Sequence, residues 1–110
     1  MGRIQLEPDQ VQLLRDVAAG RVARHRLRRG DSPADGDDYQ QDPSRGPGGL
    51  RKARARLKVL AGHGLVRLPR GEPDAEMWPW ATTDLGDAAL ARAAEQQQHA
   101  TANRALEETS

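Results

Sequence analysis

The sequence contains no cysteine, which excludes disulfide bonds, cysteine nucleophiles and Cys-ligated zinc. Phenylalanine is also absent, and Tyr39, Trp78 and Trp80 are the only residues of the Phe/Trp/Tyr class, so the core must be small and mainly aliphatic. No stretch approaches the ~20 apolar residues of a membrane span, and the first ten residues contain no apolar run that could act as a signal peptide. We therefore expect a soluble, cytoplasmic protein without membrane contact.

Motifs for catalysis and metal binding are missing as well. His25, His63 and His99 stand in unlike surroundings, and none has a partner at the spacing of a metal-binding helix. The acidic residues at 35–38 lack the distal glutamate of a complete calcium loop. No nucleophile motif, phosphate-binding glycine loop or paired-acid arrangement is recognisable. The sequence therefore predicts a protein that is not an enzyme and that uses no metal or cofactor.

Charge is nearly balanced over the whole chain, because the 110 residues carry a net charge of only +1. Its distribution is uneven: residues 1–70 contain 15 Lys or Arg against 8 Asp or Glu, whereas residues 71–110 contain 2 against 8. Such asymmetry favours an anionic partner, with nucleic acid first. The alternative is that the two halves neutralise each other through salt bridges.

The N-terminal half gives one clear element and one ambiguous one. Helical spacing of apolar residues predicts a helix over residues 7–19, ended by Gly20. The basic stretch 21–29 could form a short second helix, or the first strand of a hairpin whose partner lies near residues 38–42. Residues 31–49 contain three prolines and several glycines, which predicts a long loop with at most a brief strand around Tyr39.

The clearest predicted element is a helix over residues 50–61. Its apolar residues share one narrow face, and every charged residue on it is basic. A β-hairpin between residues 65–68 and 76–82 is predicted next, with acidic residues near its tip. Thr83 then caps a last helix over residues 84–94. The remaining polar residues, 95–110, form either a frayed helix or a tail.

Residues 50–92 resemble the second half of a winged helix-turn-helix domain in MarR-like and PadR-like regulators. The matching residues are Arg56, Leu57, Lys58, Leu60, Gly64, Leu65, Val66, Trp80, Thr83, Gly86 and Leu90. The resemblance implies a mainly helical α+β fold over residues 1–94, a winged helix-turn-helix whose wing is the β-hairpin. A regular domain of this kind has a second helix just before the recognition helix, whereas this sequence has the long loop there.

The resemblance further implies that the helix over residues 50–61 binds double-stranded DNA. Arg51, Lys52, Arg54 and Ala55 would then enter the major groove, where arginine can donate two hydrogen bonds to guanine. Arg56 and Lys58 would contact backbone phosphates. The candidate set also includes cations of the wing and of the basic stretch: Arg24, Arg26, Arg28, Arg67 and Arg70.

The predicted function is sequence-specific binding of double-stranded DNA by a small bacterial transcriptional regulator or mobile-element accessory factor. Such a protein would be associated with the nucleoid. Related regulators pair through terminal helices, which makes a homodimer possible, and the sequence leaves the oligomeric state open. The alternative is a winged-helix module for protein–protein interaction. It would use the C-terminal helix and the acidic wing, which contains Glu72, Asp74 and Glu76.

Overall fold

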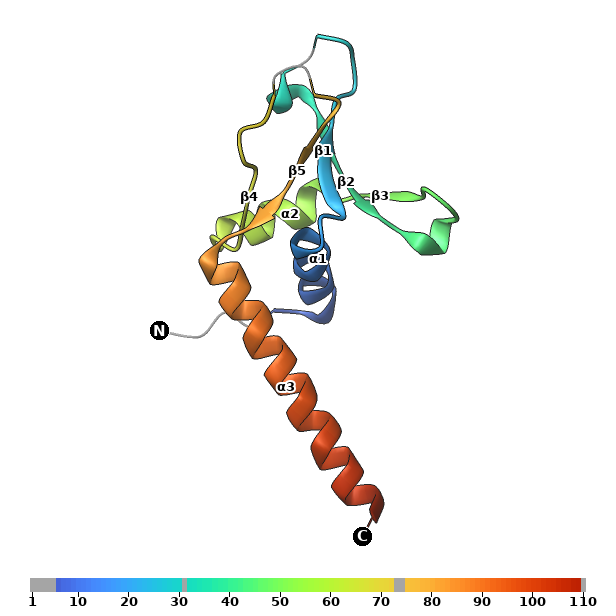
Figure 1. Ribbon diagram of the computed structural model, residues 1–110, viewed down its shortest axis with the longest axis vertical. Coiled ribbons are helices and arrows are strands. Elements are labelled where there is room, and N and C mark those ends of the chain that lie inside the picture. Colours follow the sequence, from blue (N-terminus) through green and yellow to red (C-terminus); the bar gives the residue numbers. More distant parts are fainter. Residues whose placement is uncertain (1–5, 31, 73–74, 110) are drawn as a thin grey trace.

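The computed structural model describes residues 6–30, 32–72 and 75–109, with side chains up to Gln96. These residues form three helices and six strands, and Figure 1 shows how they are arranged. Their order is α1 (Pro8–Ala18), β1 (Val22–His25), β2 (Asp37–Gln41), β3 (Leu50–Lys52), α2 (Arg54–Gly62), β4 (Val66–Arg67), β5 (Met77–Pro79), β6 (Ala81–Thr82) and α3 (Asp84–Thr109). Two short 3-10 helices, η1 (Pro33–Asp35) and η2 (Pro43–Arg45), flank β2.

Four of the strands form an antiparallel sheet in the order β3-β2-β1-β5. Along one row of this sheet, Ala23 stands opposite both Tyr39 and Pro79, and Tyr39 stands opposite Lys52. Residues 21–29 therefore take the strand alternative, because β1 pairs with β2. The brief strand expected around Tyr39 is the second strand of this sheet.

The expectation of a mainly helical winged helix-turn-helix is wrong. The described chain is an α+β structure whose centre is the four-stranded antiparallel sheet. In the described residues between α1 and α2 there are three strands and two 3-10 turns, so the pair of consecutive helices that defines a helix-turn-helix is missing. The basic stretch becomes a strand because its polar side chains find partners on β2, as the Arg24–Asp38 ion pair shows.

The helix predicted over residues 50–61 is also corrected. Its first three residues form β3 and pair with residues 39–41 of β2, and α2 begins only at Arg54. Leu50 fits the helical spacing of Leu57 in the sequence, yet its side chain is 38% exposed and lies outside the core. The amide of Ala53 donates to the carbonyl of Asp38 (2.9 Å), which connects the sheet directly to the start of α2.

The wing expected between residues 65 and 82 forms only at its base. There β4 pairs with β6, so that Val66 stands opposite Thr82. The outer strand, β5, pairs with β1 instead of β4. This pairing buries Trp78, whose side chain is 1% exposed and whose Nε1 donates to the carbonyl of Glu72 (2.9 Å). Burial of this large side chain favours the sheet over a free hairpin.

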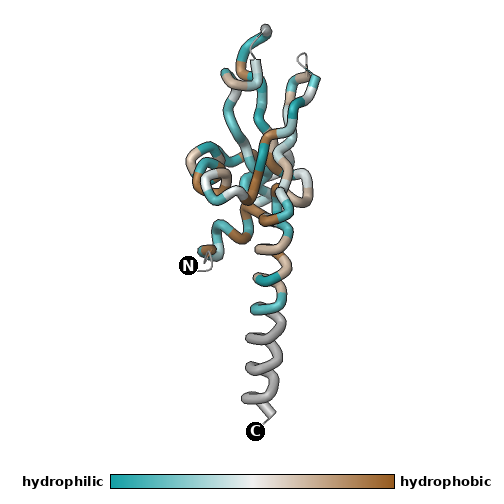
Figure 2. Tube along the Cα trace, turned by 90° about the vertical axis from the view of Figure 1, so that its left-hand side faces the viewer, coloured by the Kyte–Doolittle hydropathy of each residue, from teal (hydrophilic) through white to brown (hydrophobic). Residues whose placement is uncertain are grey.

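The core lies where α1 and α2 meet one face of the sheet (Figure 2). Alternation along the strands directs Val22 and Gln40 toward the helices and Ala23 and Tyr39 toward the opposite face. The buried cluster is aliphatic, as the absence of phenylalanine predicted. It consists of Leu13, Leu14, Val17, Val22, Ala53, Leu57, Leu60, Leu65 and Val66.

Local signals account for the helix ends. The Glu7 side chain accepts from the amide of Gln10, whose own side chain accepts from the Glu7 amide in a capping box. Gly64 turns the chain out of α2 with a φ of 73°. The hydroxyl of Thr83 accepts from the amide of Gly86 (3.1 Å) at the start of α3, as predicted for a cap.

The last helix is much longer than the predicted span of 84–94. It continues to Thr109, through the residues for which a frayed helix and a tail were the alternatives. Its first turns pack on the body through Ala89 and Leu90, and the rest projects away from the sheet (Figure 1). In the part of the chain that the structure describes, no helix combines the length and the apolar character needed to cross a membrane.

Candidate nucleic-acid interface

A row of exposed cations extends from β3 into α2. Arg51 and Lys52 on the edge strand β3 and Arg54 at the first position of α2 are all exposed, and alternation places Arg51 on the helix side of the strand and Lys52 on its open side. Lys58 follows Arg54 by four residues, the spacing that places two side chains on the same helix face, and it is exposed as well. These four cations, together with the exposed Ala55, are called the β3–α2 face below.

The N-terminus of α2 adds partial positive charge to the β3–α2 face. Its N-cap residue, Ala53, makes no side-chain cap, and the first turn contains no acid. The first amides of a helix have no carbonyl partner within the helix, and the helix dipole makes this end positive. Backbone donors and side-chain cations are therefore combined at one end of α2, an arrangement that suits phosphate.

Arg56 is turned into the molecule. It is half-buried and donates to Oε1 of Gln40 on β2 (2.6 Å) and to the carbonyl of Lys52 (2.6 Å). Gln40 in turn donates to Oδ2 of the buried Asp16 on α1 (2.6 Å). Burial and the neighbouring charge of Arg51 lower the pKa of Arg56. Arg56 thus fixes β3 and α2 relative to α1 and the sheet.

Arg24 is also an internal residue. Its Nε and Nη2 donate to the two carboxylate oxygens of Asp38 (2.9 and 3.1 Å), and its side chain is only 19% exposed. The indole of Trp80 donates to Oδ1 of the same carboxylate (2.8 Å), and the guanidinium carbon of Arg24 lies 5.4 Å from the Trp80 ring centroid. We therefore assign Arg24 to the stabilisation of the sheet.

Three other predicted cations lie at the end of the sheet that is farthest from α3. The loops that contain Arg26, Arg28 and Arg70 gather at the top of Figure 1. They are connected there by a hydrogen bond from the amide of Arg26 to the carbonyl of Glu76 (2.9 Å). The guanidinium of Arg26 lies over the Trp78 ring, at 5.7 Å from its centroid. This end of the molecule is separate from the β3–α2 face.

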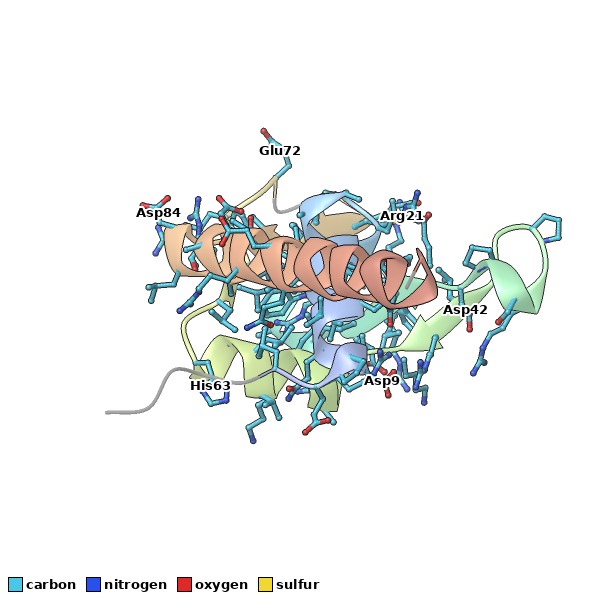
Figure 3. All side chains as sticks on the ribbon, turned by 90° about the horizontal axis from the view of Figure 1, so that it is seen from below. Asp9, Arg21, Asp42, His63, Glu72 and Asp84 are labelled. Atoms are coloured by element: carbon cyan, nitrogen blue, oxygen red, sulfur yellow. The ribbon has the colours of Figure 1, made fainter. Side chains whose placement is uncertain are left out.

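The acidic loop between β4 and β5 is directed away from α2. In Figure 3, Glu72 extends on the opposite side of the molecule from His63, which ends α2. Asp74, also predicted as part of the acidic wing, lies outside the described residues. Arg67 on β4 is exposed and follows the end of α2, so it lies beyond the helix end opposite to β3. Its position extends the basic surface only at the far end of α2.

Sequence reasoning missed the face of the sheet that the helices leave open. His25 on β1 and Tyr39 on β2 meet there, with ring centroids 5.1 Å apart. Alternation within residues 37–41 was the available signal, because it separates Tyr39 from the buried Asp38 and Gln40. The sequence alone does not show that residues 22–25 form the neighbouring strand, so it could not predict that His25 and Tyr39 lie together.

Within the described ranges there is no group of three or more His, Asp or Glu side chains placed to hold a metal ion. The chain was compared with protein-family models, with curated proteins and with solved structures, and none of the three comparisons gave a match. Its function therefore has to be inferred from the geometry and chemistry of its own surfaces.

Proposed function

We propose that the protein binds double-stranded DNA through the β3–α2 face. The row of exposed cations beside the uncapped N-terminus of α2 carries this proposal. Lysine and arginine side chains that neutralise phosphates release counterions from DNA, and this release supplies affinity that is independent of base sequence. Residues 50–62 contain no acid that would repel the phosphates.

Base recognition falls to the exposed side chains of α2. The major groove accommodates an α-helix, and Arg54 at its leading end can donate two hydrogen bonds to a guanine. Ala55 and Val59, the latter 46% exposed, offer apolar contacts of the kind made with thymine methyl groups. Arg51 and Lys52 then contact the adjacent phosphates and fix the register.

The biological role is the finer part of this proposal. The role proposed for duplex binding is that of a small bacterial transcriptional regulator or a mobile-element accessory factor, associated with the nucleoid. A homodimer belongs to the same set of predictions. The alanines in the first turns of α3 support it, since small side chains allow two helices to approach closely.

The test is DNA binding measured by fluorescence anisotropy over a series of salt concentrations. We expect wild-type affinity to fall steeply with salt. In the double variant Arg51→Ala/Lys52→Ala, the slope of log K against log salt should decrease in magnitude by about 2, because two phosphate contacts are lost. Binding at low salt should weaken in parallel for all duplex sequences.

A matched control removes the same amount of charge elsewhere. Arg29→Ala/Arg92→Ala also eliminates two exposed cations, one in the loop after β1 and one on α3. This variant should keep the wild-type slope to within a few tenths. An unchanged slope in Arg51→Ala/Lys52→Ala, or an equal decrease in the control, would overturn the proposal.

The alternative function, a protein–protein interaction module, uses other surfaces. Exposed Glu72 and Glu76 lie in the loop before β5, and Leu85 at the start of α3 is 61% exposed. Absence of any duplex binding at low salt would favour this alternative. It would then be tested by charge reversal of the two glutamates in a pull-down with an identified partner.

A further inference from the structure

The sheet face opposite the helices contains an open groove of about 660 Å³. Its floor is formed by residues from three neighbouring strands, and the loop between β2 and β3 forms one wall. The floor residues are mostly apolar or aromatic: Ala23, His25, Tyr39, Met77 and Pro79. An exposed surface of this composition is typical of an interaction site.

Two aromatic rings lie at the centre of the floor. His25 and Tyr39 are half-buried and pack edge to face, with an interplanar angle of 78°. Met77 is 52% exposed beside them on β5. Trp78 belongs to the opposite face and is 1% exposed, and the Trp80 indole is bonded to Asp38. His25 and Tyr39 are therefore the rings that this groove offers to a ligand.

The rim of the groove carries one cation. Arg21 lines it with a side chain that is 57% exposed, and its Nη1 lies 4.0 Å from Oδ1 of Asp16. Beyond the residues that line the groove, Lys52 stands opposite Tyr39 and Asp37 opposite His25, so one further cation and one acid share the open face. The one acid among the groove residues, Asp42, is paired with Arg45 (3.1 Å). The ligand that fits is a flat apolar group attached to an anion.

We propose that this groove binds unpaired bases of a single-stranded nucleic acid. Tyr39 and His25 provide the stacking surface, and Arg21 on the rim contacts a phosphate. Every base has a π-face, so this binding tolerates many sequences. An antiparallel sheet that displays aromatic side chains is a known way to bind unstacked bases. The inference goes beyond duplex binding by the β3–α2 face, because the bases of an intact duplex are stacked on each other.

A second copy of the chain fits the groove less well than a nucleic acid. Two sheets that pack face to face about a two-fold axis would bring two copies of Arg21 together. An acidic peptide could pair with Arg21, but it would not need the aromatic rings. The contribution of the rings therefore distinguishes the proposed occupant from a peptide.

The experiment measures binding of a labelled oligothymidylate of about 12 nucleotides to the full chain. Tyr39→Leu keeps apolar volume but removes the π-system, and His25→Ala removes the second ring. Each should weaken binding roughly 5- to 100-fold, whereas Tyr39→Phe should stay within about twofold of wild type. Circular dichroism and thermal melting confirm that each variant is folded. If Tyr39→Leu does not fold, His25→Ala carries the same comparison.

His63→Ala is the matched control for His25→Ala, since His63 is an exposed histidine at the end of α2 (Figure 3). It should leave oligothymidylate binding unchanged. An abasic oligomer of the same length should bind at least roughly fivefold more weakly than oligothymidylate, because it offers phosphates but no bases to stack. Equal binding of the two oligomers, or wild-type binding by both ring variants, would overturn the proposal. Binding of an acidic peptide in preference to oligothymidylate would overturn it as well.

Duplex binding by the β3–α2 face and base binding in the groove are tested by different results, so either proposal can be refuted without the other. Tyr39→Leu should leave duplex affinity within about twofold, because the substitution removes none of the cations proposed to contact duplex DNA. Loss of the Arg51→Ala/Lys52→Ala effect on duplex DNA would refute duplex binding, yet the comparison of oligothymidylate with the abasic oligomer would still decide whether bases occupy the groove.

Discussion

Replacing Asp38 with asparagine is expected to lower the free energy of unfolding by about 3–5 kcal/mol. The carboxylate is 1% exposed and accepts hydrogen bonds from Arg24 and from the Trp80 indole. An asparagine cannot accept from both guanidinium nitrogens, because one side of its amide is a donor, so the Arg24 charge loses its counter-ion in a largely buried place. Urea denaturation followed by circular dichroism measures the change.

Asp37→Asn is the control for this prediction. Asp37 is half-buried, and its Oδ1 accepts from the amide of Asp38 (2.8 Å), a bond that an asparagine oxygen can also make. The control should therefore cost less than about 1 kcal/mol. If the two variants were equally stable, Asp38 would not be the residue that holds β1, β2 and Trp80 together.

Gly86→Ala should destabilise the protein, although helix propensity alone predicts the opposite. Alanine is favoured over glycine by about 1 kcal/mol in a helix interior. A Cβ on Gly86, however, would clash with the carbonyl oxygen of Leu65. The chain after α2 and the start of α3 would have to separate, so we expect a net loss of about 2–3 kcal/mol, measured by urea denaturation.

Gly62→Ala is the matched control, with the same substitution at the end of α2. Nothing lies within 4 Å of a Cβ built there. This variant should be as stable as wild type or up to about 1 kcal/mol more stable. Stabilisation by Gly86→Ala would contradict the close packing of α3 against Leu65.

The elements predicted correctly from the sequence depend on neighbouring residues. Helix α1 has its proline at the start and Gly20 just beyond its end. Leu13, Leu14 and Val17 have helical spacing, which places them together on one buried face. The turn at Gly64 and the cap at Thr83 are local signals of the same kind. Such signals act within one or two helical turns, so they can be recognised in the sequence without knowledge of the rest of the fold.

The elements predicted wrongly depend on residues that are distant in sequence. Residues 50–52 have helical spacing, but they form a strand because residues 39–41 pair with them. The β5 strand pairs with β1 and not with residues 65–68, its expected hairpin partner. The free edge of β1 can accept another strand, and this pairing buries Trp78. Competition between local preference and non-local pairing is not visible in the pattern of a single segment.

The candidate site residues differ in the same way: the exposed cations could be predicted from the local sequence, and the internal ones could not. Exposure of Arg51, Lys52 and Arg54 was expected from an all-basic stretch with no acid to pair with. The internal roles of Arg24 and Arg56 could not be predicted, because their partners Asp38 and Gln40 lie 14 and 16 residues away along the chain. An arginine-rich composition alone does not distinguish a cation that faces solvent from one that holds two elements together.

The most direct test of duplex binding by the β3–α2 face is an NMR titration of the ¹⁵N-labelled protein with a short DNA duplex. The largest shifts or broadening should occur at the amides of residues 50–58, including the N-terminus of α2. Amides of the loop over residues 68–72 and of α3 beyond residue 90 should change little. Contact confined to that loop and to α3, with residues 50–58 unperturbed, would contradict DNA binding by this face.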